Sequence, residues 1–192
     1  MAITYEYPVT LSREDYDRLF NEATAKIDIE KIRLGGESAL REALWENYVL
    51  VNPVTDTKMY DTGVYKLDDG YIVGAWCGCK RLAEDDGNFW YHFAQPTWGK
   101  DRSGSRSWFY DEDTRRMFRQ FVIDQGCVGA LAVHNPDSPA ATAIKSHFSN
   151  SWDGRQYWED PTIHTIEEVY GENTIGNVSD SMRCMKVRII TD

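Results

Sequence analysis

The chain has 192 residues and a formal net charge of −10 at neutral pH, from 21 basic and 31 acidic side chains. A surface this acidic repels phosphate backbones, so we expect no nucleic-acid partner. Apolar residues make up 42% and charged residues 27%, which excludes a disordered tail or a coiled coil, and the length fits one domain, 1–192. No apolar run approaches the ~20 residues that span a bilayer and no signal peptide is seen, so we expect a soluble, cytoplasmic protein without membrane contact.

The cysteines indicate neither a disulfide scaffold nor a metal site. There are four of them, and they are too scattered for a stapled fold. Cys77 and Cys79 are close in sequence, but no second pair follows at the spacing that a zinc site requires. We therefore predict free thiols and no metal.

The first half of the chain predicts a strand, two helices and a β meander. Ser12 is expected to cap a helix, because apolar residues follow it at helical spacing. A second helix over 37–51 is predicted from an apolar face that ends at Val51. Two aspartates followed by Gly70 are a hairpin turn signal. The strands predicted in this half are 2–8, 59–67, 71–82 and 88–95, the last of which stops before Pro96.

The second half alternates helices and strands. Residues 99–107 form a polar loop, and apolar spacing over 114–125 predicts a helix that Gly126 ends. A buried strand is predicted over 128–134 and a helix over 138–148. Two further strands are predicted at 161–168 and 182–190. This order predicts an α/β fold with a mixed sheet and helices on both faces.

One stretch has a resemblance to a known family. Within 111–148, a helix ends at Gly126, a buried strand leads to Asn135, and a further helix ends at Phe148. Together with the order of the elements, this stretch resembles the GNAT family of N-acetyltransferases. The resemblance implies a GNAT-like mixed, mainly antiparallel sheet with helices on both faces. It also implies a groove for acetyl-CoA along the strand that Asn135 follows.

The loop before this helix departs from the family's phosphate-binding turn. In that family, an Arg/Gln-x-x-Gly-x-Gly/Ala turn cradles the pyrophosphate with backbone N–H groups, whereas the loop here, 102–107, has one glycine. The contacts to acetyl-CoA that the resemblance implies are Arg102, Gly104, Arg106 and Asn135. Arginine side chains match phosphate oxygens well. The alternative is a solvated loop paired with the carboxylates of 111–113, which also repel a diphosphate at the start of the helix.

The catalytic residues are unknown, with two histidines as candidates. The family often places a general acid, a tyrosine, five residues before the closing phenylalanine, and that position is Ala143 here. His92 lies in a predicted strand, where it is either a general base or a structural residue in a sheet packed on both sides. His134 ends a central strand, the edge at which open α/β sheets bind ligands.

Two functions from different classes remain open. The first is a non-catalytic binding or assembly component with a degenerate acetyl-CoA loop, whose partners are other proteins or neighbouring chains. GNAT-like proteins of this kind are similar to ones carried by tailed phages, where a virion part is one use. The second is an acetyl-CoA-dependent N-acetyltransferase that acts on an amine. The two missing family features favour the first.

Overall fold

The computed structural model describes residues 3–25, 35–82, 87–101, 107–108, 111–134, 163–170 and 183–189. The chain divides into two compact units, one of Met1–Gly78 with Ala94–Met117 and the other of Cys79–Phe93 with Phe118–Asp192. Strands β3 (Ile72–Leu82) and β4 (Phe89–Trp98) and helix α3 (Glu112–Asp124) have residues in both units. That 1–192 forms one domain stays a prediction.

The sheet is mixed and mainly antiparallel, as predicted. The remaining elements are β1 (Ile3–Glu6), α1 (Arg13–Thr24), α2 (Gly36–Val49), β2 (Asp61–Leu67), β5 (Gly129–His134), β6 (Ile163–Tyr170) and β7 (Arg183–Ile189). The strand order is β1-β2-β3-β4-β5-β7-β6. Strand β4 pairs in parallel with β5, whereas β1 with β2, β2 with β3, β5 with β7 and β6 with β7 are antiparallel.

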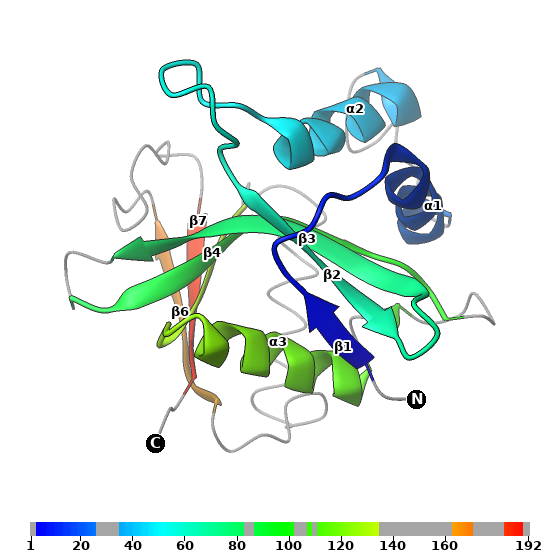
Figure 1. Ribbon diagram of the computed structural model, residues 1–192. Coiled ribbons are helices and arrows are strands. Elements are labelled where there is room, and N and C mark those ends of the chain that lie inside the picture. Colours follow the sequence, from blue (N-terminus) through cyan, green and yellow to red (C-terminus); the bar gives the residue numbers. More distant parts are fainter. Residues whose placement is uncertain are drawn as a thin grey trace. The chain divides into compact units, whose positions relative to one another are not determined.

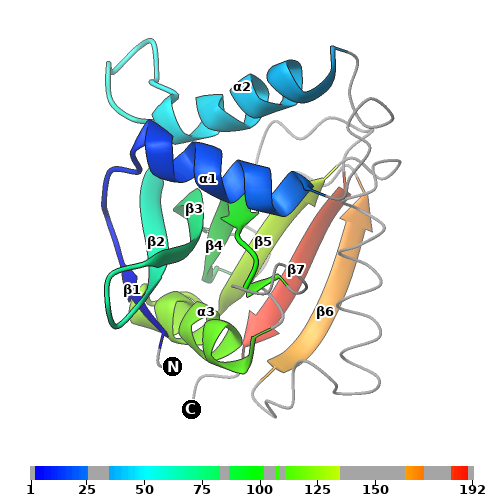
Figure 2. The same ribbon diagram turned by 90° about the vertical axis from the view of Figure 1, so that its right-hand side faces the viewer.

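In the first unit, α1 and α2 lie side by side on one face of the strands (Figures 1 and 2). Helix α1 begins as predicted, because the Ser12 hydroxyl accepts a hydrogen bond from the backbone N–H of Asp15. Its apolar stripe packs against β2 and β3, and the buried members of this cluster are Leu11, Tyr16, Leu19, Phe20, Tyr48, Val64, Ala75 and Cys77. Burial of these side chains is the main stabilising contribution in this unit.

Helix α2 ends earlier than its predicted limit at residue 51. The chain turns extended at Leu50 and forms a short hairpin over residues 50–59, which we call the 50–59 hairpin. Val51 is consequently 42% exposed instead of buried on the helix face. Figure 1 shows this segment, in cyan, extending away from the helix. Local hydrogen bonds of the hairpin outweigh the helical pattern here.

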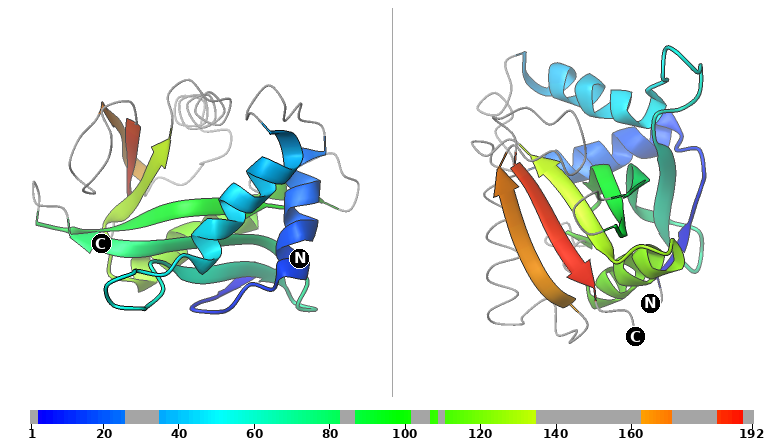
Figure 3. Two further views of the ribbon diagram at one scale, coloured as in Figure 1. Left: turned by 90° about the horizontal axis from the view of Figure 1, so that it is seen from above. Right: turned by 90° about the vertical axis from the view of Figure 1, so that its left-hand side faces the viewer.

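In the second unit, β7 lies between β5 and β6 (Figures 2 and 3). The part of α3 in this unit packs on β4, where Phe118 and Phe121 contact Phe93, and Phe121 also contacts Tyr91. Phe93 and its neighbour Ala94 point to opposite faces of β4, and Ala94 packs against the α1–α2 cluster. Each unit therefore has helices packed on its own part of the sheet.

Candidate functional site

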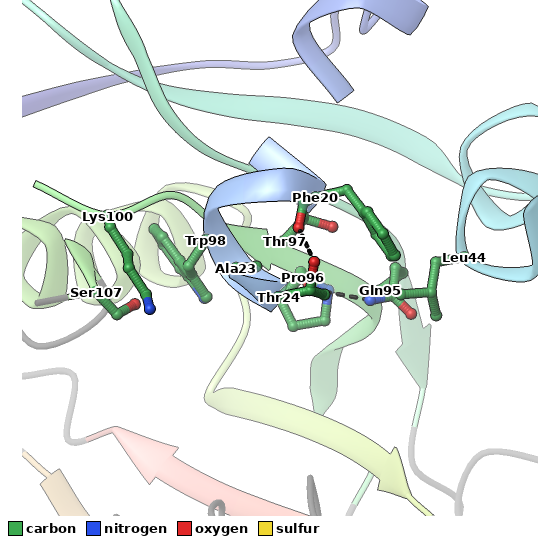
Figure 4. Close-up of a pocket in the computed structure, with 10 residues that line it drawn as sticks. All are labelled: Phe20, Ala23, Thr24, Leu44, Gln95, Pro96, Thr97, Trp98, Lys100 and Ser107. Carbon is green, nitrogen blue, oxygen red and sulfur yellow. Dashed lines mark hydrogen bonds between the residues drawn. The ribbon is translucent and has the colours of Figure 1, made fainter. Parts of the chain in front are cut away.

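A pocket of about 250 Å³ opens in the first unit where α1 and α2 meet the end of β4. Figure 4 shows the side chains that line it: Phe20, Ala23, Thr24, Leu44, Gln95, Pro96, Thr97, Trp98, Lys100 and Ser107. Most of this lining is apolar, and the polar groups are a few hydroxyls, one amide and one ammonium. Such a site suits an apolar group with a polar or anionic end.

The floor of the pocket is formed by an irregular stretch of β4. Ala94 packs on the α1–α2 cluster, and the Thr97 hydroxyl lies 2.8 Å from the Tyr48 hydroxyl of α2, so both residues face the same helices. Residues three apart lie on opposite faces of a regular strand, so the alternation of side chains is not kept between Ala94 and Thr97. Pro96 lies in this interval and is exposed. The prediction that the strand stops before Pro96 was wrong, because the irregularity accommodates a residue that has no N–H to donate.

Tyr48 holds this stretch of β4 against α2. Its hydroxyl also lies 3.1 Å from the carbonyl oxygen of Gln95, to which it can donate. The side chain is buried, and this burial raises the pKa of Tyr48 well above its ordinary value. Tyr48 therefore keeps its proton and serves as a hydrogen-bonding group behind the pocket.

The rim of the pocket is fixed by contacts between α1 and the residues that follow β4. Glu22 of α1 accepts a hydrogen bond from the backbone N–H of Lys100 at 3.2 Å. Gly99 permits this approach, because a Cβ there would lie 2.9 Å from the Glu22 carboxylate. The indole N–H of Trp108 donates to the Lys100 carbonyl at 3.1 Å. The backbone that carries Lys100 is thus held on both sides.

Trp98 forms another wall and rests on the sheet. Its ring stacks on Tyr65 at 5.0 Å between centroids and lies directly over Gly74, where a Cβ would come within 2.4 Å of the indole. Tyr65 in turn contacts Trp76, which is wholly buried. At least two of the tryptophans therefore pack within the fold of the first unit.

His92, a catalytic candidate from the sequence, is a buried residue of β4 in the second unit. It is 8% exposed, and burial, helped by the charge of Arg81, lowers its pKa to about 4. A histidine with this pKa is neutral at physiological pH and is a weak base. It does not line the pocket. Whether His92 has a catalytic or a structural role stays a prediction.

Of the other predicted site residues, the structure describes His134 alone. His134 is the last residue of β5, at the strand end that the sequence predicted. The expected acetyl-CoA contacts Arg102, Gly104, Arg106 and Asn135 lie outside the described residues, as does Ala143.

Within the part of the chain that the structure describes, no three His, Cys, Asp or Glu side chains group as a metal would need, and no helix is long and apolar enough to cross a membrane.

Sequence reasoning found only the edge of this pocket. Lys100 and Ser107 belong to the predicted polar loop, and both line it. The α1 and β4 residues were missed, because Phe20 and Trp98 are far apart in sequence and meet only in the folded unit. A proline, Pro96, next to an apolar strand was the sequence signal for the irregular stretch of β4 at the pocket floor.

No protein-family model matches the sequence, and no curated protein matches it. Solved structures similar to the chain include a GNAT-family acetyltransferase from Staphylococcus aureus, 11% identical, covering 98% of this chain and 100% of that chain with a TM-score of 0.49. A GNAT-family acetyltransferase from Listeria monocytogenes is 8% identical, covering 97% and 95% with a TM-score of 0.49. A Bacillus subtilis acetyltransferase in complex with CoA is 10% identical, covering 98% and 99% with a TM-score of 0.42.

Proposed function

We propose that this chain is a GNAT-like protein that acts by binding other protein chains, as a non-catalytic component of an assembly. The observation that carries the proposal is a run of exposed apolar side chains in the first unit, at the end of α2 and in the 50–59 hairpin. Its members are Val49, Leu50, Val51, Val54 and Met59, exposed by 46%, 41%, 42%, 90% and 37%. Several exposed apolar side chains within one short segment are typical of sites that a partner covers.

The sequence supports the same proposal, because it lacks two features of the family's catalytic members. The loop 102–107 has one glycine where the family has a backbone cradle for pyrophosphate, and Ala143 stands where the family often has its general acid. A virion part of a tailed phage is the kind of assembly that the sequence resemblance suggests.

The second candidate is an acetyl-CoA-dependent N-acetyltransferase, and one observation favours it. The pairing of β4 with β5 takes in Trp90–His92 and Gly129–Leu131, and both strands continue beyond it. This limited pairing supports a role for backbone groups of β4 past His92 in binding an extended ligand. If acetyl-CoA binds, Arg102, Arg106 and Asn135 are the residues to hold it, and backbone N–H groups of the strand would polarise its carbonyl.

Calorimetric titration with acetyl-CoA, followed by an assay of CoA release with a panel of amines, separates the two. The proposed function predicts no acetyl transfer and no heat up to about millimolar acetyl-CoA, a concentration at the top of the usual range of KM values. Micromolar binding with turnover would overturn it in favour of the enzyme. The variant Arg102→Ala with Arg106→Ala is the matched control, because it should abolish binding only if the loop holds the cofactor.

A further inference from the structure

We infer that the partner of the 50–59 hairpin is a second copy of this chain, and that the tip of the hairpin occupies the pocket between α1, α2 and β4 of that copy. The inference rests on the proposed function and names the partner of the same surface. It explains two features of the first unit by one contact, in which the exposed apolar tip of one copy fills the apolar pocket of the other.

The hairpin is built to present its tip. Its two arms are joined by a hydrogen bond from the N–H of Met59 to the Leu50 carbonyl, 2.8 Å, and by an antiparallel bridge between Val51 and Lys58. At the tip, the Asn52 side chain accepts hydrogen bonds from the N–H groups of Val54 and Thr55. Because these contacts are internal to the hairpin, Val54 is held in place while 90% exposed. A preordered element loses little conformational entropy when it docks.

The pocket has the size and chemistry to receive this tip. Its volume is about 250 Å³, whereas a cavity of ~150 Å³ lined by apolar side chains already holds a benzene molecule. The isopropyl group of Val54 therefore fits, with space for part of a neighbouring residue. Phe20, Leu44 and Trp98 supply an apolar lining.

Charge sets the orientation of the tip. Asp56, two residues after Val54, is exposed and has a left-handed backbone conformation, φ 55°. Lys100 lies at the pocket. An apolar tip with an adjacent carboxylate thus matches an apolar pocket with an adjacent ammonium group. This pairing matters because each copy carries a net charge of −10, and the resulting repulsion disfavours less complementary contacts.

The test is the oligomeric state of the full chain, measured by analytical ultracentrifugation over a range of concentrations at about 0.15 M salt, where distant charges are screened. We expect a concentration-dependent dimer. Val54→Asp should weaken it by about tenfold or more, because it places a charge in an apolar pocket. Leu82→Asp is the matched control, since Leu82 is 53% exposed and lies in the other unit. This control should dimerise like the parent chain.

Variants of the pocket test the other half of the contact. Ala23→Trp should fill the pocket and abolish the dimer, and Lys100→Glu should weaken it without filling any space. In a reciprocal dimer, a mixture of the Val54→Asp and Ala23→Trp chains keeps one intact tip and one intact pocket. This mixture should therefore form a heterodimer that is tighter than the homodimer of either variant. Circular dichroism of each variant confirms that it is folded.

Three results would overturn the inference: a parent chain that stays monomeric, a Val54→Asp dimer as strong as that of the parent, or a Lys100→Glu variant with an unchanged dimer. These results are distinct from failure of the proposed function. A monomer that transfers no acetyl group leaves a binding role with another partner, whereas a dimer that releases CoA overturns the binding role and leaves the dimer contact standing.

Discussion

The hydroxyl groups of Tyr48 and Thr97 lie 2.8 Å apart, and this hydrogen bond joins α2 to the irregular end of β4. The two residues are 49 positions apart in sequence and both are buried. The bond therefore sets the position of the pocket floor relative to the helix that covers it.

Tyr48→Phe should destabilise the protein by about 1–2 kcal/mol, because it leaves the buried Thr97 hydroxyl with one partner fewer. Thr97→Val removes the other partner and should cost a similar amount. Chemical denaturation of both single variants and of the double variant measures the coupling. Simple additivity of the two losses would contradict a direct bond between the hydroxyls.

His92 should make stability depend on pH in the acidic range. Its folded pKa is about 4 against an ordinary 6.5, so the unfolded chain takes up a proton first as the pH falls. The stabilisation is complete above about pH 6.5 and is lost between that value and about pH 4, by about 3 kcal/mol in total. His92→Phe cannot take up this proton. Unfolding free energies measured at several pH values should therefore be less steep for the variant over this window, and equal slopes would refute the assignment.

Gly74→Ala should cost about 1–3 kcal/mol, because the added methyl group would lie 2.4 Å from the Trp98 ring. In a Trp98→Ala background the space is open, so the same substitution should cost much less. Gly70→Ala is the control: nothing lies within 4 Å of its Cβ, and its cost comes from a backbone φ of 88°. That cost should be the same in both backgrounds, as measured by denaturation.

Arg41→Met should destabilise the packing of α1 on α2 more than Arg13→Met does. Arg41 is 17% exposed, bonds Asp17 at 3.0 Å and lies over the ring of Phe20. Arg13 also pairs with Asp17 at 3.0 Å but is 39% exposed. We expect a loss of about 1–2 kcal/mol for Arg41 and less than about 0.5 kcal/mol for Arg13, as thermal unfolding can show. Losses of equal size would indicate that burial does not distinguish the two arginines.

Much of the fold follows from local patterns in the sequence. Ser12 caps α1, the turn at Gly70 joins β2 to β3, and Gly126 follows α3 with a φ of 72°. Each of these signals depends on a few adjacent residues. The end of α2 was misplaced because the hairpin turn at Asn52 competes with helical periodicity, and an apolar pattern cannot show which of the two is stronger.

The site was harder to predict because it depends on contacts between distant segments. Lys100 was recognised as part of a polar loop, but nothing near it in the sequence points to Phe20 or Leu44. His92 was considered as a base because of its residue type, and only the folded structure shows that it is buried in β4. Periodicity in the sequence shows which residues face the core, but it does not show which of them line the same pocket.

Pro96 also bears on how this protein avoids aggregation. An exposed length of strand can recruit strands from other molecules, and such edge-to-edge growth requires an unbroken row of N–H donors. Pro96 is exposed in β4, contributes no donor, and lies where the regular alternation of the strand is interrupted. Pro96 therefore makes this stretch of β4 a poor template for fibrils.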